Sequence, residues 1–596
     1  MSVELRRARS RQMLIFLLVC VGMVTLIGRL YYWQVVRGYG PARCADGYGL
    51  AQCANLEHIQ NQILNAPRGL IYDSQGHILA TNVVRDDVYI EPIQFSIDHS
   101  PDNFQSALTT LVETLHRILP TVSQDTLYKD FNLGLQTVRI ASRIDPAQSA
   151  QLRSLQLSDI FLEPRTWRTY PGGTLAAQIL GYVQQDEQKN IGVYGIEQQY
   201  DALLTGKPGS FTAEFDLSGN PLVVGASSEQ PAVNGANLTL TIDSTIQYMV
   251  ETALAKTVKQ LEAESGTAVV INVRTGAVVA MAGAPTFDPN QYGKYANLTG
   301  CLGAESVFFN PALYCAYEPG STMKAVTMAA ALDQGLITPD TSFYDPGYRE
   351  FDDAPIVRNW NYQGYGTETM TQVLEHSANV GAAYVAHDIL GARRYYPYLP
   401  KFGFGQKTRI DGQEEAGFYR TPDNSPTLWS PSDLTRQAFG QSIDATPLQM
   451  AMAYATIANG GLMMRPYLVA SIDNNGHVVT TQPSILRRVI STHAAQLLTE
   501  MLMHSASDGL AQPARVPGYT IAAKTGTATS QNLADNLTEA SVAGFLPATN
   551  PQFVILVKID HPLVTIYGGT AAAPLWKAIG QQLMWYYHIP PDEAQP

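Results

Sequence analysis

Two side chains that could form an acylating pair, Ser321 and Lys324, stand three residues apart just before a run that predicts a helix (325–332). On a helix, residues i and i+3 lie on one face, so the hydroxyl and the amine can meet. A serine is a poor nucleophile until a base takes its proton, and lysine is such a base only when burial or a second cation lowers its pKa. Since a long chain contains roughly one S-x-x-K by chance, an exposed Ser and Lys is the alternative for this motif alone.

Two further motifs strengthen the acyl-transfer interpretation. The K-T-G-T sequence at 524–527 is the only K-T-G in the chain, and it lies in a β-branched, small-residue run (519–529) that predicts a strand. An S-A-N triplet at 377–379 lies between the other two motifs. S-x-x-K, S-D-N and K-T-G form the signature of class A β-lactamases and penicillin-binding proteins, and the central Ala departs from the β-lactamase form. Pairing of Ser377 with the preceding His376 is the weaker alternative, because sequence neighbours on a helix point apart.

With these motifs the chain resembles the class B penicillin-binding proteins, the monofunctional D,D-transpeptidases that cross-link peptidoglycan. The resemblance extends over nearly the whole chain. It includes segments similar to the family's R-G-x-I-x-D-x-x-G (68–76), R-x-Y-P-x-G (168–172) and G-x-E (195–197), and further matching stretches at 440–441, 446–449, 458–461 and 544–547. The segment 568–579 looks more like division-type than elongation-type members.

The resemblance implies an α+β fold in which an antiparallel five-stranded sheet is sandwiched by helices. We expect a cytoplasmic tail (1–11), a transmembrane anchor (12–36), a pedestal or dimerisation-type domain (37–234), a transpeptidase domain (235–590) and a short tail (591–596). The residues themselves predict a hairpin at 68–82, helices at 101–119 and 146–157, a helix capped by Asp243, a hairpin at 267–283, strands at 540–546 and 553–560, and a closing helix at 571–587.

The resemblance also implies roles for individual residues. Ser321 attacks the penultimate D-Ala carbonyl, Lys324 is the base for acylation, Ser377 relays the proton, and Lys524 polarises this network and attracts the terminal carboxylate. Substrate binding falls to Asn379, Thr525, Gly526 and Thr527. No cofactor or metal is expected, and β-lactams should acylate Ser321. The alternatives are a D,D-carboxypeptidase or β-lactamase-like hydrolase, and a non-catalytic penicillin-binding scaffold or sensor.

An uncharged apolar stretch from Gln12 to Gly28, extended by aromatic and aliphatic residues to Val36, has the length of a membrane span. Arginines precede it, which places the N-terminus in the cytoplasm and the rest outside by the positive-inside rule. A cleaved signal peptide is the alternative, but no small-x-small cleavage site follows promptly. We therefore expect a single-pass protein of the plasma (inner) membrane with an extracytoplasmic catalytic domain. Expected partners are peptidoglycan stem peptides ending in D-Ala-D-Ala, a polytopic SEDS-type glycosyltransferase and other cell-wall assembly proteins.

The cysteine content agrees with an extracytoplasmic enzyme, and the net charge bears only on the kind of partner. The net charge of −13 argues against a nucleic-acid partner, because phosphate binding needs a basic face. Apart from Cys20 in the apolar stretch, the four cysteines lie where disulfides can persist. Four cysteines allow three pairings, and we expect the two local ones, Cys44 with Cys53 and Cys301 with Cys315.

Overall fold

The computed structural model of the chain describes residues 3–37, 59–185, 190–214, 227–301, 305–352, 354–529 and 537–593. By contacts the chain divides into two compact units, one of residues 1–67 with 206–234 and the other of residues 68–205 with 235–596. The second unit therefore combines the transpeptidase region with most of the region that the sequence assigns to the pedestal. The boundary at residue 234 stays a prediction.

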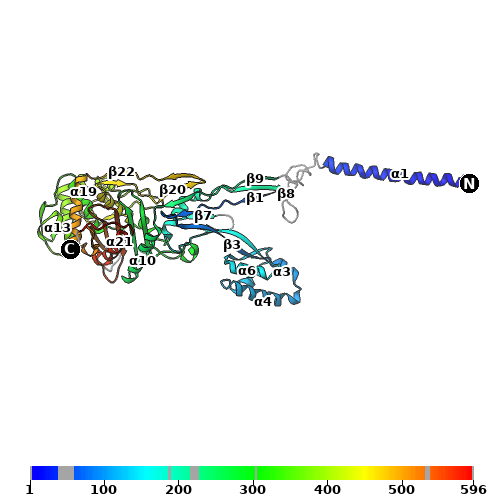
Figure 1. The fold of residues 1–596 in the computed structure, drawn as a ribbon, viewed down its shortest axis with the longest axis horizontal. Helices are drawn as coiled ribbons and strands as arrows, with labels where there is room; N and C mark the ends of the chain where they lie inside the picture. Colours follow the sequence, from blue (N-terminus) through cyan, green and yellow to red (C-terminus); the bar gives the residue numbers. More distant parts are fainter. Residues whose placement is uncertain are drawn as a thin grey trace. The chain divides into compact units, whose positions relative to one another are not determined.

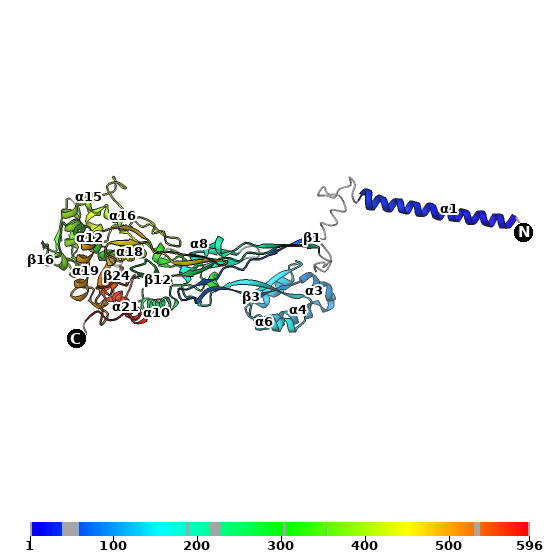
Figure 2. The same ribbon diagram turned by 45° about the horizontal axis from the view of Figure 1, so that its top comes forward.

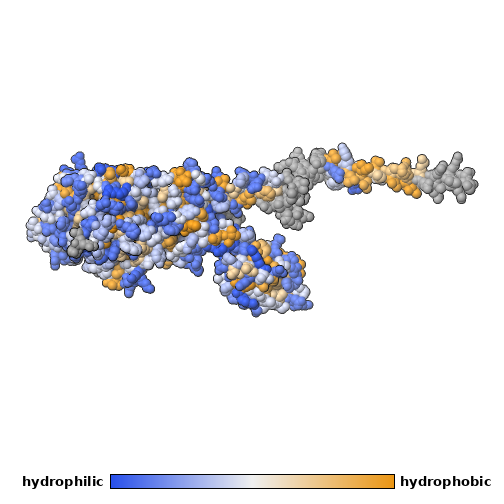
Figure 3. Space-filling view, viewed as in Figure 1, coloured by the Kyte–Doolittle hydropathy of each residue, from blue (hydrophilic) through white to orange (hydrophobic). Residues whose placement is uncertain are grey.

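The first unit contains one long apolar helix and a small antiparallel sheet. Helix α1 (Val3–Tyr31) continues as the π-helical turn η1 (Tyr32–Arg37). Its stretch Met13–Val36 has a mean hydropathy of 2.4 and is not buried by any other part of the structure, and its surface is largely apolar in Figure 3. This length and composition suit a bilayer-spanning helix. The sheet has the order β1 (Ile59–Leu64), β8 (Gly209–Glu214), β9 (Ser227–Gln230).

A five-stranded antiparallel sheet forms the centre of the second unit. Its order is β12 (Val278–Ala284), β11 (Ser265–Asn272), β25 (Phe553–Asp560), β24 (Thr538–Leu546), β23 (Ala522–Thr529). The expected hairpin and all three expected C-terminal strands are present. The K-T-G strand β23 lies at one edge, so its outer side is free of a neighbouring strand in the described sheet.

Helices cover both faces of this sheet (Figures 1 and 2). Alternate residues of β11 enter two different cores: Val269 and Ile271 join the core that includes α12 (Lys324–Asp333) and α18 (Pro447–Ala458), whereas Ala268 and Val270 join the core that includes α10 and α21. This is the period-two alternation of a strand, with both faces buried. Helices α10 (Ser244–Gln260) and α21 (Ala573–Tyr586) lie on the second face, and Asp243 caps α10 by accepting hydrogen bonds from the main chain of Thr245 and Ile246, as expected.

The elements between β12 and β23 carry most of the remaining site residues. They include η4 (Gly320–Met323), β13 (Ser342–Asp345), β14 (Tyr348–Arg349), β15 (Val357–Arg358), β16 (Gly366–Thr369), α13 (Met370–Glu375), α14 (Asn379–Tyr384), α17 (Pro431–Gln437) and α19 (Thr492–Ser507). The short helix α20 (Gly568–Ala571) follows β25. Strands β13 and β16 pair with each other, as do β14 and β15. Most of these elements are short, so their positions depend on tertiary packing more than on local propensity.

A second sheet of the same unit joins the pedestal-type segments to the transpeptidase region. Strand β10 (Asn237–Leu240) pairs in parallel with β2 (Ile71–Tyr72) and antiparallel with β20 (Val469–Asn474). Strand β3 (Ile78–Ile90) extends this sheet and pairs with β4 (Val138–Ile144) and β5 (Ile160–Thr169). The helices α4 (Pro101–Ile118), α5 (Gln124–Phe131) and α6 (Pro146–Ser154) pack on β3 and β4 with a small core of their own, as the lobe in Figure 2 shows.

Three sequence motifs of this region converge on one buried carboxylate. Arg68 Nε and Arg168 Nε each donate to Glu197 at 2.7 Å, and Tyr170 Oη donates to the same carboxylate at 3.2 Å. Glu197 is fully buried. A buried charge is stable only when it is paired and hydrogen-bonded, and here two guanidinium groups do this for one carboxylate.

Candidate active site

Ser321 lies in a tight 3-10 turn, η4, immediately before helix α12. Gly320 has a φ of +56°, and a Cβ there would lie 3.1 Å from the carbonyl of Thr527 on β23. Gly440, with a φ of +80°, faces it so closely that a Cβ would lie 2.1 Å from Gly320 O. Glycine is therefore required at both positions, and the turn is pressed against the K-T-G strand.

Lys324 begins α12 and is fully buried. Its Nζ donates to Ser377 O at 2.6 Å, to Ser377 Oγ at 3.1 Å and to Asn379 Oδ1 at 2.8 Å. Within the described residues none of its hydrogen bonds goes to the Ser321 hydroxyl, although the i, i+3 spacing predicted that pairing. The Lys324 amine is thus hydrogen-bonded to the S-A-N segment, and Ser321 lies one turn before Lys324 in the chain.

Burial and a second cation hold the pKa of Lys324 well below its usual value. The second cation is Lys524 on β23, which is also fully buried, and burial lowers its own pKa to about 7. The charged form of an amine loses hydration when it is buried, and a like charge nearby adds repulsion. A neutral lysine can accept a proton, so the arrangement suits a base at ordinary pH.

Ser377 and Asn379 lie between α13 and the start of α14. Ser377 is 3% exposed and has a φ of +56°, a left-handed backbone conformation that is uncommon for serine. The Asn379 amide has two partners, since its Nδ2 donates to Arg358 O at 3.0 Å while its Oδ1 accepts from Lys324. The sequence assigned Asn379 to substrate binding; in the structure its amide also holds the lysine.

The K-T-G strand supplies the opposite wall. A Cβ on Gly526 would lie 2.3 Å from Ser541 Oγ and 2.7 Å from Pro319 O, so glycine is needed there for the approach of the Ser321 turn. Thr527 Oγ1 accepts a hydrogen bond from the main-chain N–H of Gly568 at 3.0 Å, which leaves its own proton to donate. Thr525 is 5% exposed.

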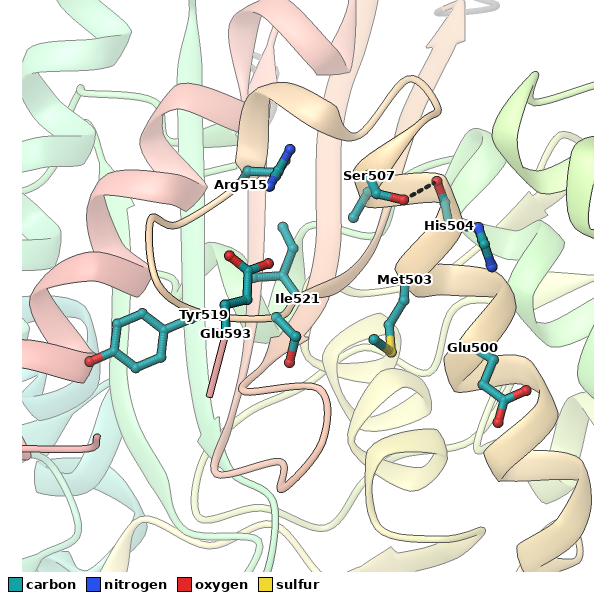
Figure 4. Close-up of a pocket in the computed structure, with 10 residues that line it drawn as sticks. Glu500, Met503, His504, Ser507, Arg515, Tyr519, Ile521 and Glu593 are labelled. Carbon is teal, nitrogen blue, oxygen red and sulfur yellow. Dashed lines mark hydrogen bonds between the residues drawn. The ribbon is translucent and has the colours of Figure 1, made fainter. Parts of the chain in front are cut away.

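These motifs line one cleft with a volume of about 860 Å³. Ser321, Ser377 and Asn379 line it together with Thr525 and Thr527. Figure 4 shows a different pocket, of about 220 Å³, that is lined by residues of α19 and of the segment 515–521 together with Glu593. Of the described residues around that pocket, none also lines the cleft, so the residues of the three motifs face the larger space and not the smaller one.

Comparison with protein families agrees with this geometry. Residues 266–581 match the penicillin-binding protein transpeptidase domain, and residues 63–240 match the penicillin-binding protein dimerisation domain. The chain belongs to the class B penicillin-binding proteins. As in that family, it is a serine-type transpeptidase, and the one long apolar helix found among the described residues is consistent with a single-pass membrane protein.

Individual relatives align over most of their lengths with this class B penicillin-binding protein. The Stage V sporulation protein D of Bacillus subtilis is 30% identical over 93% of this chain and 83% of its own length. The peptidoglycan D,D-transpeptidase FtsI of Escherichia coli is 28% identical over 97% of this chain and 92% of its own. The crystal structure of penicillin-binding protein 3 from Mycobacterium tuberculosis, complexed with aztreonam, has a TM-score of 0.66 at 26% identity and covers 89% of this chain and 98% of its own.

A disulfide joins Cys301 to Cys315, six residues before Ser321, and is one of the two expected local pairings. Cys44 and Cys53, the other expected pair, lie outside the described residues. The sequence reasoning missed two aromatic side chains of the cleft, Trp360 and Tyr567, whose rings meet edge-on with centroids 5.9 Å apart. It also missed two buried carboxyl groups near Lys324, those of Asp345 and Glu368. No short motif marks these residues, because they lie in loops and in two-to-four-residue strands.

Proposed function

We propose that this class B penicillin-binding protein is a peptidoglycan D,D-transpeptidase whose nucleophile is Ser321. Its hydroxyl oxygen bonds to the penultimate D-Ala carbonyl carbon of a stem peptide, the peptide C–N bond breaks, and the terminal D-Ala leaves as an amine that gains a proton. An amine of a neighbouring stem peptide then attacks the acyl-enzyme, which forms the cross-link and frees Ser321. This is nucleophilic catalysis through a covalent intermediate.

Lys324 is the proposed base for acylation. The observation that carries this role is its full burial beside the cleft, with the pKa held low by burial and by Lys524. Ser377 Oγ, 3.1 Å from Lys324 Nζ, is placed to relay the proton to the leaving amine. General acid–base steps of this kind contribute about 10²- to 10⁴-fold to rate.

The substrate would be held along β23. We propose that the terminal carboxylate of the substrate is bound by Thr525, Thr527 and the Lys524 ammonium. Asn379 and Gly526 would lie along the main chain of the substrate peptide. The main-chain N–H groups of Ser321 and Thr527 are proposed as the oxyanion hole, which the close packing of Gly320 against Thr527 supports. One such donor is typically worth about 3–4 kcal/mol of transition-state stabilisation.

The apolar helix is proposed to anchor the protein in the plasma membrane with its N-terminus in the cytoplasm, since arginines 6, 7, 9 and 11 precede the span. The catalytic unit would then lie on the side where peptidoglycan is found. Division-type relatives support a role in septal synthesis, with a polytopic SEDS-type glycosyltransferase and other cell-wall assembly proteins as partners. Imaging a fluorescent fusion at the septum or at the sidewall tests this role.

Covalent labelling tests the chemistry. The purified full chain is expected to bind a fluorescent penicillin in a bond that survives denaturation, with the added mass on the Ser321 peptide. Ser321→Ala should lose labelling by at least about 10³-fold while keeping its thermal unfolding midpoint, because the hydroxyl contributes chemistry and not packing. A folded wild-type chain without label would refute the proposal. Rapid turnover of nitrocefin would instead indicate a β-lactamase, and release of D-Ala without an acceptor would indicate a carboxypeptidase.

A further inference from the structure

Two buried carboxyl groups, Glu368 and Asp345, lie on neighbouring strands directly behind the S-A-N loop. Glu368 belongs to β16 and is 2% exposed; Asp345 ends β13 and is 1% exposed. In the antiparallel register Phe343 faces Glu368 and Asp345 faces Gly366. Residues that face each other, or that are two apart on one strand, share a face, so the two carboxyl groups lie on the same face of this strand pair, and Asp345 acts on the pKa of Glu368. The catalytic scheme given above uses neither of them.

Each carboxyl group holds one flank of the loop that carries Ser377 and Asn379. Glu368 Oε2 lies 3.0 Å from Nδ1 of His376, the residue before Ser377. Asp345 Oδ2 accepts from Asn359 Nδ2 at 2.7 Å, and Asn359 Oδ1 in turn accepts from the main-chain N–H of Val380, the residue after Asn379, at 3.1 Å. The loop is therefore held on both sides of its reactive residues. Such support is needed because the left-handed backbone of Ser377 is intrinsically unfavourable.

The hydrogen bonds indicate which of the two groups carries a proton. Asp345 accepts from two donors, the main-chain N–H of Gly347 and the Asn359 amide, both at 2.7 Å, as a carboxylate would. Glu368 Oε1 is fully buried, and among the described residues no N–H or O–H group donates to it. A proton on Glu368, shared with Asp345, satisfies both groups, since two adjacent buried carboxyls cannot both ionise readily.

The electrostatics agree with this assignment. Burial, then Asp345, raise the pKa of Glu368 to about 8, so the neutral form of Glu368 is favoured at pH 7. Both carboxyl groups act on the pKa of Lys324 in the raising direction, against burial and Lys524. A second negative charge would therefore favour the protonated lysine and weaken it as a base. The titratable groups that face Glu368 are Asp345 of β13, Lys324 of α12, Glu375 of α13, His376 at the end of α13, and Tyr365, which stacks on His376 just before β16.

We propose that Glu368 and Asp345 form a carboxylic acid–carboxylate pair that positions the Ser377–Asn379 loop and limits the negative charge near Lys324. The inference rests on the proposed function, because it assigns a purpose to the loop that binds the catalytic lysine. Glu368 is a positioning residue: it acts through His376 and Lys324 and does not line the cleft that would hold substrate.

The test compares two replacements of Glu368 in the full chain purified in detergent, with the acylation rate constant for a fluorescent penicillin measured from pH 6 to pH 9.5. Glu368→Gln keeps a neutral hydrogen-bonding group, so its rate should match the wild type at pH 7 within about twofold, and the ratio of its rate to that of the wild type should rise above pH 8, where only the wild type ionises. Glu368→Leu loses the hydrogen bond to His376 and should be slower by about 10- to 100-fold at every pH, the size of effect expected when a catalytic group is misplaced.

A matched control is Glu414→Leu. Glu414 is also buried and accepts hydrogen bonds from the main-chain N–H groups of Thr408 and Arg409, but it lines no part of the cleft. Its loss should lower thermal stability and leave the acylation rate of the folded protein at the wild-type value. If Glu368→Leu does not fold, the pH profile of Glu368→Gln decides alone.

Some outcomes overturn this inference and others overturn the proposed function. Labelling of Glu368→Leu at the wild-type rate, or a constant ratio of Glu368→Gln to wild type from pH 7 to pH 9.5, refutes the positioning pair while the function stands. A wild-type chain that no penicillin labels refutes the function, and the inference with it.

Discussion

Lys324 and Glu197 are both fully buried, yet burial affects their charges in opposite ways. Burial would raise the pKa of Glu197, but Arg168 and Arg68 together hold it below its usual value, so the carboxylate stays charged. For Lys324, burial and Lys524 act in the same direction, and its neutral form is favoured. Two positive neighbours stabilise a buried anion, whereas one positive neighbour further destabilises a buried cation.

The difference separates structural from reactive groups. The Arg68–Glu197–Arg168 cluster joins segments of the second unit that lie far apart in the sequence and uses its charges for that purpose. Within the described part of the chain, the two lysines beside the cleft donate to neutral oxygens: Lys324 donates to Ser377 and Asn379, and Lys524 Nζ donates to Thr525 O at 3.3 Å. A buried group whose charge is not balanced is available for proton transfer, which is why perturbed pKa values gather at functional sites.

The largest expected effect comes from removing Lys324, the proposed base. Lys324→Met should lower the acylation rate constant for penicillin by about 10²- to 10⁴-fold, because the proposed nucleophile Ser321 would lose the group that takes its proton. The thermal unfolding midpoint should shift less than that of Glu197→Gln, since the buried Lys324 amine favours its neutral form, whereas Glu197 pairs with buried guanidinium groups. Stopped-flow labelling and thermal denaturation measure the two quantities. A variant that labels normally would show that another group deprotonates Ser321.

Glu197→Gln makes the reciprocal change. It leaves the buried Arg168 guanidinium without its Glu197 partner, while Arg68 keeps Asp201 at 2.8 Å, and the free energy of unfolding should fall by about 3 kcal/mol. Acylation of the remaining folded protein should keep the wild-type rate, because Glu197 does not line the cleft. Urea denaturation at 25 °C gives the first quantity, and labelling below the transition gives the second. An acylation defect without a loss of stability would contradict the division into structural and reactive charges.

The smallest effect concerns the pH dependence of Lys524. With its pKa at about 7, this lysine is charged at pH 6 and largely neutral at pH 8, so attraction of the β-lactam carboxylate should weaken across that range. We expect the acylation rate constant to fall by up to about tenfold across this range. That factor corresponds to the loss of one solvent-screened attraction between the Lys524 ammonium and the β-lactam carboxylate. Lys524→Arg keeps its charge throughout and should lose this decline. A decline that persists in the variant would assign it to another group.

The titration of Lys524 also makes the stability of the protein depend on pH. An unfolded lysine keeps its proton to about pH 10.4, whereas buried Lys524 loses its proton near pH 7. The lowered pKa therefore contributes stability that is fully present above the pKa of the lysine in the unfolded chain. This stability is lost as the pH falls through about 7, the pKa in the folded protein. Lys524→Arg, which cannot become neutral, should be less stable than the wild type by a margin that grows from pH 7 to pH 9.

Local sequence patterns predicted the parts of the site that lie on regular elements. The S-x-x-K pattern identified Ser321 and Lys324, and the β-branched run around K-T-G predicted strand β23. Helical spacing also predicted that the serine and lysine side chains can meet. In the structure Ser321 lies in a 3-10 turn and the lysine amine donates hydrogen bonds to the S-A-N loop. That partner is supplied by α13 and α14, whose approach to α12 depends on packing across the domain.

The sequence by itself determined the family, the order of the chemical motifs, the apolar anchor and the antiparallel sheet, because each of these follows from residue type and short-range periodicity. Only the tertiary structure decided that Lys324 is desolvated, that Lys524 lies close enough to repel it, and that Glu368 and Asp345 meet behind the loop. A pKa depends on the dielectric and the charges around a group. Those surroundings come from segments that are distant in the sequence, so no pattern within one segment can specify them.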